Sequence, residues 1–284
     1  MIIGVLGPAG SYSEKAAKKW SKKLKCLETP LFQYYEDITD TFSAIVDKTI
    51  DFGVVPVENS IEGSVGITLD QLFENEVTIT GEIVVPIEHC LLSKGTLSDI
   101  KIILSHPQAL AQCRNFLKTH FKNTELRTTG STSHAAKLAT EFEEMAAIAS
   151  RSSAEMYGLN ILISSIQDQN ENYTRFLVIT SKDGYSNSLL IPSEHLYKTS
   201  IIVYLDKNCP GALYEILEEF AKRRINLTKI ESRPSKKALG DYLFYIDFEG
   251  NIQDEIIKDA LNKLKTKVKM LKILGSYPED NYNH

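Results

Sequence analysis

Short apolar runs alternate with amphipathic stretches along the first part of the chain. Runs such as DFGVVPV, KIILS and AAIAS have the length and the β-branched content of buried strands. Stretches such as SEKAAKKWSKKL and SHAAKLATEF repeat apolar residues every three or four positions, which is typical of helices. This alternation predicts α/β layers with mostly parallel sheets.

The same pattern divides the chain into blocks. Two adjoining runs, VTITGEIVVPI and HCLLS, are predicted strands that lead from a first α/β block into a second one. The alternation stops near residues 182–198, where Ser, Gly, Asp and Pro indicate a domain boundary. Beyond it, the predicted order is strand, helix, strand, strand, helix, strand, which is that of a ferredoxin-like βαββαβ domain.

The charge balance narrows the class of ligand. The 284 residues carry a net charge of -5, and no stripe of Lys and Arg outweighs the acidic residues. We therefore expect no nucleic-acid partner. An anionic small molecule is compatible with this balance, because one Arg and a few oriented backbone N–H groups can hold a carboxylate.

Cysteine usage and hydropathy indicate the compartment. The four cysteines form neither a CxxC pair nor a zinc-ligand spacing, so we expect free thiols, a reducing compartment and no metal. No apolar stretch reaches the ~20 residues of a membrane span. The start, MIIGVLGPAGS, has the pattern of a first strand and not of a signal peptide. We expect a cytoplasmic protein without a membrane partner.

The glycines of IGVLGPAGS are spaced GxxGxxG, whereas a dinucleotide fingerprint is spaced GxGxxG. Pro8 also removes a backbone N–H from the turn in which a nucleotide loop needs such donors. We therefore predict a tight turn between a strand and a helix, and no nucleotide cofactor.

Small hydroxyl-rich loops follow several predicted strands. Taken singly, each is most simply a helix N-cap. Together, at the carboxyl ends of strands, they indicate a crevice in which helix N-termini favour an anion. The five loops are GSYSE (10–14), ENSIEGS (58–64), SHPQ (105–108), STSH (131–134) and SRSS (150–153). We predict a cleft between two α/β lobes for a polar ligand that carries carboxylates.

Other chemistry-bearing residues leave alternatives open. Glu58 and Glu62 are either a carboxylate pair for acid–base work or a structural pair around a turn, and we favour structure. For Asn59 and Ser60, contact with a ligand and capping are equally compatible with the pattern. No histidine pairs with a nucleophile and an Asp in a recognisable motif, so we predict no catalytic triad.

The motif NYTRFLVIT places Thr174 and Arg175 at the start of a predicted buried strand. In the last third, Pro210 and Gly211 form a turn that enters a helix. The βαββαβ block after residue 198 is either a unit that only dimerises or a ligand-sensing module whose sites form where two copies meet.

Taken together, the motifs GPAGSYSE, GVVPVENSIEGSV, SHPQALAQC, STSHAA, AAIAS and NYTRFLVI, followed by GALYEIL and ESRP, resemble the monofunctional bacterial prephenate dehydratases. The resemblance covers nearly the whole chain in the expected order. No chorismate mutase segment precedes it, which implies the single-activity form. Ser11 and Tyr12 stand where the family often has Thr and Phe, and this change keeps a hydroxyl and an aromatic ring.

The resemblance implies a two-lobed catalytic domain like the periplasmic binding proteins, over residues 1–182, and a regulatory ACT domain over 199–278. One lobe would comprise about 1–75 plus 173–182, and the other about 76–172. The catalytic residues implied are Thr174, Asn59, Ser105 and Gln112. The substrate-binding residues implied or expected are Ser60, Arg175, Phe176, Ser11 and Thr132. An allosteric L-phenylalanine site is implied at Asn208, Pro210, Gly211, Ala212, Leu213, Glu231, Ser232, Arg233 and Pro234, shared across a dimer.

The implied reaction converts prephenate to phenylpyruvate in phenylalanine synthesis, without a cofactor and under feedback inhibition by L-phenylalanine. We expect Arg175 and helix N-termini to bind the carboxylates, and Thr174 to donate a hydrogen bond to the departing hydroxyl. A homodimer or homotetramer is expected. Two alternatives remain, an arogenate dehydratase and a non-catalytic sensor of amino acids or carboxylates.

Overall fold

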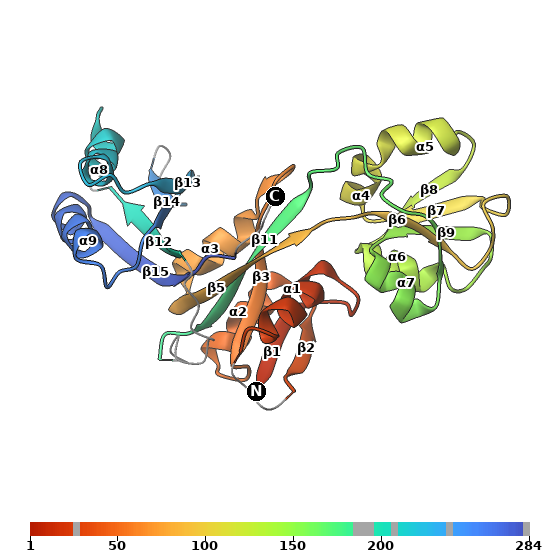
Figure 1. The fold of residues 1–284 in the computed structure, drawn as a ribbon, viewed down its shortest axis with the longest axis horizontal. Coiled ribbons are helices and arrows are strands. Elements are labelled where there is room, and N and C mark those ends of the chain that lie inside the picture. Colours follow the sequence, from red (N-terminus) through yellow and green to blue (C-terminus); the bar gives the residue numbers. More distant parts are fainter. Residues whose placement is uncertain (25–28, 184–195, 206–209, 237–240, 281–284) are drawn as a thin grey trace.

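A computed structural model describes residues 1–24, 29–183, 196–205, 210–236 and 241–280. Three units follow one another across the molecule, each built on its own sheet (Figure 1). Lobe one lies in the middle of that view, lobe two on the right and the C-terminal domain on the left. No helix in the described ranges is both long enough and apolar enough to cross a membrane.

Lobe one is a mixed sheet in the order β2-β1-β3-β11-β5, with the short β4 paired to β3. Parallel pairing joins β1 to β2 and β3, while β11 is antiparallel to both of its neighbours. Its strands are β1 (Ile2–Leu6), β2 (Leu31–Tyr35), β3 (Phe52–Asn59), β4 (Gly63–Ser64), β5 (Val77–Pro86) and β11 (Tyr173–Ser181). Its helices are α1 (Tyr12–Ser21), α2 (Ile38–Val46) and α3 (Gly66–Glu74).

This sheet corrects the predicted lobe boundary. The strand β5 was assigned to lobe two from residue 76 onward, but it pairs with β11 along nine residues and closes the sheet of lobe one. Local sequence does not encode which distant strand a segment pairs with, so the pattern could not settle this. The expectation of mostly parallel sheets is also wrong for β11, which returns from lobe two and enters antiparallel.

Lobe two is a five-stranded sheet in the order β10-β6-β9-β7-β8. Its strands are β6 (Cys90–Ser93), β7 (Ile102–Ser105), β8 (Glu125–Thr128), β9 (Met145–Ala149) and β10 (Asn160–Ile163). Its helices are α4 (Pro107–Gln112), α5 (Arg114–His120), α6 (Thr132–Leu138) and α7 (Arg151–Tyr157). The amphipathic stretch QALAQCRNFLKTHF forms two helices and not one, because it is interrupted at Cys113, whose φ of -112° and ψ of 19° are not helical.

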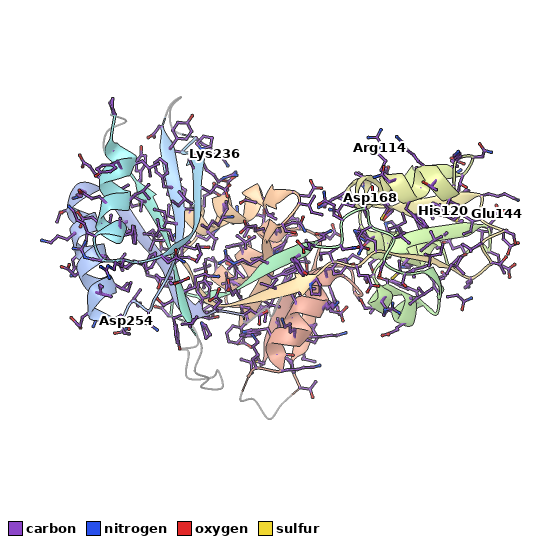
Figure 2. All side chains as sticks on the ribbon, turned by 45° about the horizontal axis from the view of Figure 1, so that its top comes forward. Arg114, His120, Glu144, Asp168, Lys236 and Asp254 are labelled. Carbon is purple, nitrogen blue, oxygen red and sulfur yellow. The ribbon has the colours of Figure 1, made fainter. Side chains whose placement is uncertain are left out.

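Two connections join the lobes, residues 87–89 and 164–172, which lie between β5 and β6 and between β10 and β11. Asp168 anchors the second connection to lobe two. Its carboxylate accepts the backbone N–H of Asn115 at 3.0 Å in the first turn of α5, where a helix leaves N–H groups unpaired. Its own N–H donates to the carbonyl of Gln112 at 2.7 Å. Figure 2 labels Asp168 beside Arg114 at this end of the helix.

The C-terminal domain confirms the predicted βαββαβ order. Its antiparallel sheet has the order β13-β14-β12-β15, which is ferredoxin-like. Its elements are β12 (Tyr197–Tyr204), α8 (Ala212–Ala221), β13 (Leu227–Pro234), β14 (Tyr242–Glu249), α9 (Glu255–Lys267) and β15 (Met270–Pro278). The helices α8 and α9 cover one face of this sheet. The predicted α/β fold is therefore confirmed, with two α/β lobes and a third, ferredoxin-like domain.

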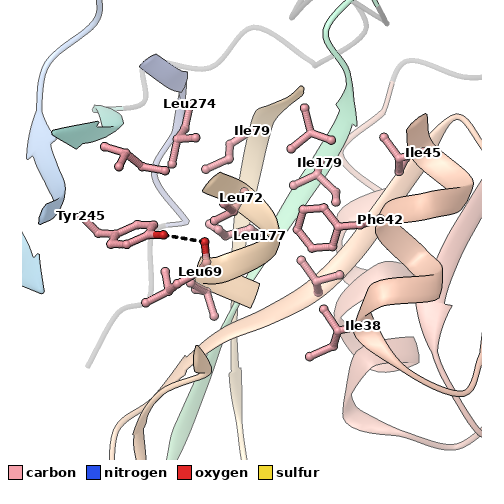
Figure 3. Packing of buried hydrophobic residues seen from close by; sticks show 14 of the residues in the cluster. Ile38, Phe42, Ile45, Leu69, Leu72, Ile79, Leu177, Ile179, Tyr245 and Leu274 are labelled. Carbon is pink, nitrogen blue, oxygen red and sulfur yellow. Dashed lines mark hydrogen bonds between the residues drawn. The ribbon is translucent and has the colours of Figure 1, made fainter. Parts of the chain in front are cut away.

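The other face of this sheet packs on lobe one in a continuous hydrophobic core (Figure 3). Leu274 and Tyr245 lie against Ile79 and Leu72, and the Tyr245 hydroxyl donates to the carbonyl of Leu69 at 2.8 Å. The backbones of β15 and β5 approach so closely that a Cβ on Gly275 would lie 2.2 Å from the carbonyl oxygen of Ile79. The C-terminal domain is thus packed against lobe one as tightly as a protein interior.

Candidate active site

A cleft of about 260 Å³ opens between the two lobes, at the carboxyl ends of β1 and β3. This is the place that open α/β sheets offer to ligands. From lobe one and the first connection it is lined by Leu6, Gly7, Ser11, Tyr12, Ser13, Pro56, Asn59, Ile87, Thr174 and Phe176. From lobe two and its edge it is lined by His89, His106, Gln108, Ala109, Gln112, Gly130, Ser131 and Thr132.

Thr174 and Asn59 are cross-strand partners at the rim of this cleft. Thr174 begins β11, Asn59 ends β3, and the two residues face each other in the ladder. The Asn59 Nδ2 amide donates to Thr174 Oγ1 at 2.9 Å and to Asn172 Oδ1 at 2.8 Å. Sheet pairing therefore holds a threonine hydroxyl and a buried amide in contact.

The direction of these hydrogen bonds follows from the backbone. Asn59 Oδ1 accepts the N–H groups of Ile61 and Glu62 at 3.0 and 3.1 Å, so the other end of the amide must be the donor. Thr174 Oγ1 is consequently an acceptor towards Asn59, and its own hydrogen is available for a second partner. A hydroxyl that accepts one bond is polarised to donate the next one more strongly.

The hydrogen-bond chain continues into lobe two. Because Asn172 Oδ1 accepts from Asn59, its Nδ2 donates to Gln112 Oε1 at 2.9 Å. His89 Nε2 lies 2.9 Å from the same oxygen, so this nitrogen carries the proton. Gln112 Nε2 then makes no hydrogen bond within the described part of the chain. The chain from Asn59 to His89 spans both lobes through the two connections.

His89 is held neutral by its surroundings. Its side chain is buried, and this burial lowers the pKa of the imidazole, although the bond to Gln112 opposes the shift. Among the described residues, Nδ1 has no hydrogen-bond partner. A second proton on Nδ1 would thus be buried without an acceptor, which favours the singly protonated ring that donates to Gln112.

Helix N-termini supply positive character to the cleft. Ser11 caps α1 through the N–H of Glu14, and Ser131 caps α6 through the N–H of His134. The N–H groups of the first turn of a helix have no intrahelical partner and attract anions. A neighbouring hollow shares Ser11 with the cleft and is lined by Glu14 and by four lysines of and after α1, namely Lys15, Lys18, Lys19 and Lys22. Lys18 is paired with Glu14 and Lys19 with Asp280. Together these groups favour an anionic ligand.

Arg175 does not lie in the cleft, which corrects the prediction that it binds a substrate carboxylate. Side chains alternate along a strand, so Thr174 and Phe176 face the cleft and Arg175 faces the opposite side of the sheet. There its guanidinium donates to Glu82 at 2.6 Å and to Asp247 at 2.6 Å. Both contacts lie at the boundary with the C-terminal domain.

Two predicted serines have structural partners instead of facing the cleft. The Ser105 hydroxyl is fully buried and donates to the carbonyl of Ile148 at 2.6 Å, which ties β7 to β9. The exposed Ser60 exchanges backbone and side-chain bonds with Tyr173 and Glu171. The prediction of cleft contacts for these two side chains is wrong in this structure.

The ENSIEGS loop also differs from the expectation. It makes the turn between β3 and β4 and does not open a helix, since α3 begins only at Gly66. The other four loops do begin helices, at α1, α4, α6 and α7. The GPAGS segment is the predicted turn, and the Gly10 N–H in it donates to the Glu14 carboxylate. A donor that a nucleotide phosphate would use is thereby occupied.

The residues of the implied phenylalanine site are divided by the structure. Asn208 lies outside the described residues. Pro210, Gly211, Ala212 and Leu213 form the entry to α8, where Gly211 has a φ of 90°. On β13, the side chains of Glu231 and Arg233 turn towards lobe one and bind Ser64 and Asp70.

Ser232 and Pro234 alternate with these residues on β13 and are exposed on its other face. The structure therefore separates the segment into a half-buried, ion-paired face and an open face.

Sequence reasoning did not assign a role in the site to Tyr12 and His89, which line the cleft, or to Asn172, which bonds to Asn59 beside it. Tyr12 and His89 contact each other edge to face, with ring centroids 6.4 Å apart. Asn172 belongs to the motif NYTRF, and this position in the motif could have indicated its role in the site. His89 stands alone in the sequence, and no pattern connects it to Gln112, which follows 23 positions later.

Cys90 and Cys113 are free and buried, whereas Cys26 and Cys209 lie outside the described residues. No cluster of three His, Cys, Asp or Glu residues suited to a metal ion occurs in the described ranges.

Comparison with known proteins agrees with this geometry. The family model described as prephenate dehydratase matches residues 3–184, and the ACT domain model matches residues 199–266. A protein of Methanocaldococcus jannaschii named prephenate dehydratase is 44% identical over 275 residues, which cover 95% of this chain and 96% of that protein. A protein of Arabidopsis thaliana named arogenate dehydratase/prephenate dehydratase 2 is 39% identical, over 98% of this chain and 72% of that protein.

Among solved structures, the prephenate dehydratase of Arthrobacter aurescens in complex with L-Phe superposes with a TM-score of 0.86 and 33% identity. The match covers 98% of this chain and 90% of that one. The chain therefore belongs to the prephenate dehydratase family and carries a C-terminal ACT domain.

Proposed function

We propose that the protein catalyses the decarboxylating dehydration of prephenate to phenylpyruvate. The observation that carries this proposal is the Thr174 hydroxyl, which lines the anion-favouring cleft and accepts a bond from Asn59, so that its own hydrogen remains to be donated. A reaction that needs one hydrogen bond at a departing hydroxyl matches such a site. The family relationship supports the same substrate class.

In the proposed reaction, the ring carboxylate leaves as carbon dioxide and its bonding electrons enter the ring. The bond between the ring and its hydroxyl breaks at the same time, and the departing hydroxide is released to the solvent, which supplies the proton that makes it water. The ring becomes aromatic, which supplies the driving force. The protein then has to orient a dianion and stabilise the negative charge that grows on the departing oxygen.

Thr174 would donate the hydrogen bond that stabilises this oxygen. A threonine is far too weak an acid to transfer a proton freely, so its role is a positioned donor. The bond that it accepts from Asn59 both fixes its rotamer and polarises its O–H group. Gln112 Nε2 is a second donor directed at the same cleft.

The carboxylates would be bound by the N-terminal turns of α1 and α6 and by the hydroxyl of Thr132, which lines the cleft. Ser11 also lines the cleft, but its hydroxyl donates to the carbonyl of Leu6 at 2.9 Å and serves as the cap of α1. The lysines of the neighbouring hollow would raise the local concentration of a dianion. Phe176, buried at the cleft wall, gives the ring an apolar surface.

We further propose that L-phenylalanine inhibits the enzyme through the C-terminal domain. The solved relative in complex with L-Phe supports this ligand. The open face of β13, with Ser232 and Pro234, and the turn at Gly211 would form the site together with a second protomer. A homodimer or homotetramer in the cytoplasm, without a cofactor, is the assembly that this proposal requires.

The test is turnover of prephenate and of arogenate by the purified chain, followed through phenylpyruvate and phenylalanine formation. Thr174→Ala should lower kcat on the order of 10²–10³-fold, as loss of an oxyanion donor does. Thr174→Ser keeps the hydroxyl and should retain most of the rate. Equal rates for Thr174→Ala and the parent chain would refute the role of this hydroxyl.

The second substrate decides between the alternatives. Turnover of arogenate alone would make the chain an arogenate dehydratase with the same mechanism, a possibility that the name of the Arabidopsis relative includes. Binding of prephenate without turnover of either compound would leave a sensor and would refute the enzymatic proposal.

A further inference from the structure

The two strands that carry Asn59 and Thr174 have a second pair of partners one step along the ladder. Asn59 pairs with Thr174, and the adjacent Glu58 pairs with Arg175. Because side chains alternate, the first pair faces the cleft and the second pair faces the C-terminal domain. Each active-site residue is therefore the backbone neighbour of a charged residue on the other side of the sheet.

Arg175 is bound almost entirely by buried acceptors. Its side chain is 13% exposed, and it donates to Glu82 of β5 at 2.6 Å. From the C-terminal domain, Asp247 and the Tyr277 hydroxyl accept at 2.6 and 2.8 Å. Burial alone would raise the pKa of Asp247, but the Arg175 guanidinium holds that pKa below its usual range. Both groups are consequently charged.

The same cluster extends within the C-terminal domain. Ser200 donates to Asp247 at 2.6 Å and lies 2.6 Å from the Tyr277 hydroxyl. Lys198 binds the second oxygen of Glu82 at 2.9 Å. Strands β12, β14 and β15 thus all hold the guanidinium next to Thr174. In such a buried cluster, the loss of one partner leaves a charge without compensation, so the arrangement is rigid.

Glu58 makes the corresponding contact next to Asn59. Its carboxylate lies 3.0 Å from Lys229 Nζ of β13 and 3.8 Å from Arg175 Nη1. Lys229 is only 10% exposed, and it also donates to Ser64 at 2.6 Å and lies 3.4 Å from Glu231. The segment that contains Glu231 is the one that we assign to phenylalanine binding.

We propose that the C-terminal domain positions the active-site pair, through Lys229 on Glu58 and Asp247 on Arg175. Glu58 and Arg175 are positioning residues, which act on Asn59 and Thr174 through one step of backbone. This inference rests on the proposed function for its kinetic readout. It explains why a motif residue beside the reacting hydroxyl points away from the cleft.

The inference also connects the open face of β13 to the reaction. Lys229 and Glu231 alternate along β13 with Ser232 and its exposed neighbours. A ligand that shifts β13 by binding its open face moves the Lys229 ammonium relative to Glu58. Asn59 then shifts with Glu58, and its bond to Thr174 lengthens or turns. Inhibition would follow from geometry, without any contact between the inhibitor and the cleft.

The experiment compares two lysines of the same domain boundary. Lys229→Met removes the contact to Glu58. Lys272→Met is the matched control, because Lys272 is 14% exposed and bridges the C-terminal domain to the carbonyls of Phe73 and Asn75, away from the active-site strands. Lys229→Arg restores the charge. Glu58→Gln removes the same ion pair from the other side and decides the test if Lys229→Met does not fold.

We expect Lys229→Met and Glu58→Gln to lower kcat about tenfold or more, because small misplacements of reacting groups cost up to about 10² in rate. KM should change much less, since the carboxylate-binding helix N-termini lie elsewhere. Lys272→Met should keep kcat within about twofold of the parent chain, because it does not displace the reacting groups. This holds whatever the substitution does to the melting temperature. Lys229→Arg should recover most of the rate.

A second readout does not depend on turnover. Amide hydrogen exchange at the end of β3 and the start of β11 should accelerate in Lys229→Met and Glu58→Gln but not in Lys272→Met. If Lys229→Met and Lys272→Met had the same kcat and the same amide exchange, the inference would be overturned while the proposed function stood. If the parent chain turned over neither substrate, the proposed function would fail, and exchange would still decide the coupling.

Discussion

The substitution Asn59→Asp tests the direction of the hydrogen-bond chain with almost no change of shape. Asn59 Nδ2 has three acceptors, Thr174 Oγ1, Asn172 Oδ1 and the carbonyl of Tyr173, at 2.9, 2.8 and 3.1 Å, so one of its two hydrogens is shared. In the variant an oxygen replaces this donor. The other oxygen keeps its bonds from the N–H groups of the following turn, so the carboxylate remains in place.

The variant should turn the Thr174 hydrogen away from the substrate. An acceptor at position 59 attracts the O–H group of Thr174, which can no longer donate to the departing hydroxyl. The amides of Asn172 and Gln112 can rotate to donate in the reverse direction. This rotation forces the proton of His89 onto Nδ1, which has no acceptor among the described residues, and leaves the Tyr173 carbonyl without its donor. The stability loss should therefore lie at the upper end of about 1–3 kcal/mol. The rate should fall by roughly 10²–10³, or about 2.7–4 kcal/mol of transition-state stabilisation.

The pH dependence of this variant gives a sharper signature. When the introduced carboxyl at position 59 is protonated, it is again a donor to Thr174, so kcat should rise as the pH falls through the pKa of this carboxyl. That pKa should lie above the ordinary value of about 3.9, because position 59 is buried and burial disfavours the charged form. Asn59→Ala has no such proton and should show no recovery.

The assay is steady-state turnover of prephenate from about pH 5 to about pH 8, the range over which folded proteins are usually most stable, with urea unfolding of each variant as the stability control. A kcat within about tenfold of the parent chain at the alkaline end would refute the assigned bond direction, since an oxyanion donor is worth more than that. So would a pH profile for Asn59→Asp that matches that of Asn59→Ala.

Two further predictions test other parts of the molecule. Gly211→Val should abolish inhibition by phenylalanine and leave basal turnover unchanged, because valine strongly disfavours the φ of 90° at this helix entry. As a control, the same change at Gly158, whose φ is 63°, should leave inhibition intact. Unaltered inhibition in Gly211→Val would show that the assigned site is wrong. Asp280 binds two lysines of lobe one and a backbone N–H of β5; burial alone would raise its pKa, but these partners hold that pKa below its ordinary value. A carboxyl whose pKa is lower in the folded state stabilises the fold above its unfolded pKa, and this stability is lost as the pH falls through the folded pKa. In urea unfolding, Asp280→Asn should therefore cost about 1–3 kcal/mol near pH 7 and almost nothing near about pH 2. An equal cost at both pH values would contradict this prediction.

The sequence predicted the elements better than their partners. The periodicities located α1 and α6, the strands β3, β7 and β9, and the order of elements in the C-terminal domain, because each signal lies within ten or so residues. It missed β2, whose LFQYY pattern leaves most side chains partly or fully exposed and therefore lacks a buried face. The loops that open helices were predicted for the same local reason, since an N-cap is a contact between near neighbours.

The candidate site was predictable where its residues lie in one motif or cap one helix. Thr174, Asn59, Gln112, Ser11, Thr132 and Phe176 all line the cleft. Ser105 also follows a strand, but its hydroxyl is consumed by a carbonyl of β9, a contact that only the pairing of β7 with β9 creates. His89 joined the site because two connections between the lobes meet there.

The sequence by itself determined that Thr174 and Arg175 occupy opposite faces of one strand, since alternation is a local property of extended backbone. Only the tertiary structure decided which face of the strand lines the cleft and which face packs against the C-terminal domain. That choice depends on the antiparallel return of β11 between β3 and β5, and on Asp247 and Tyr277 reaching the guanidinium from residues far along the chain. Pairing over such distances is a property of the whole fold, because many strands compete for each partner and only their joint packing selects one arrangement.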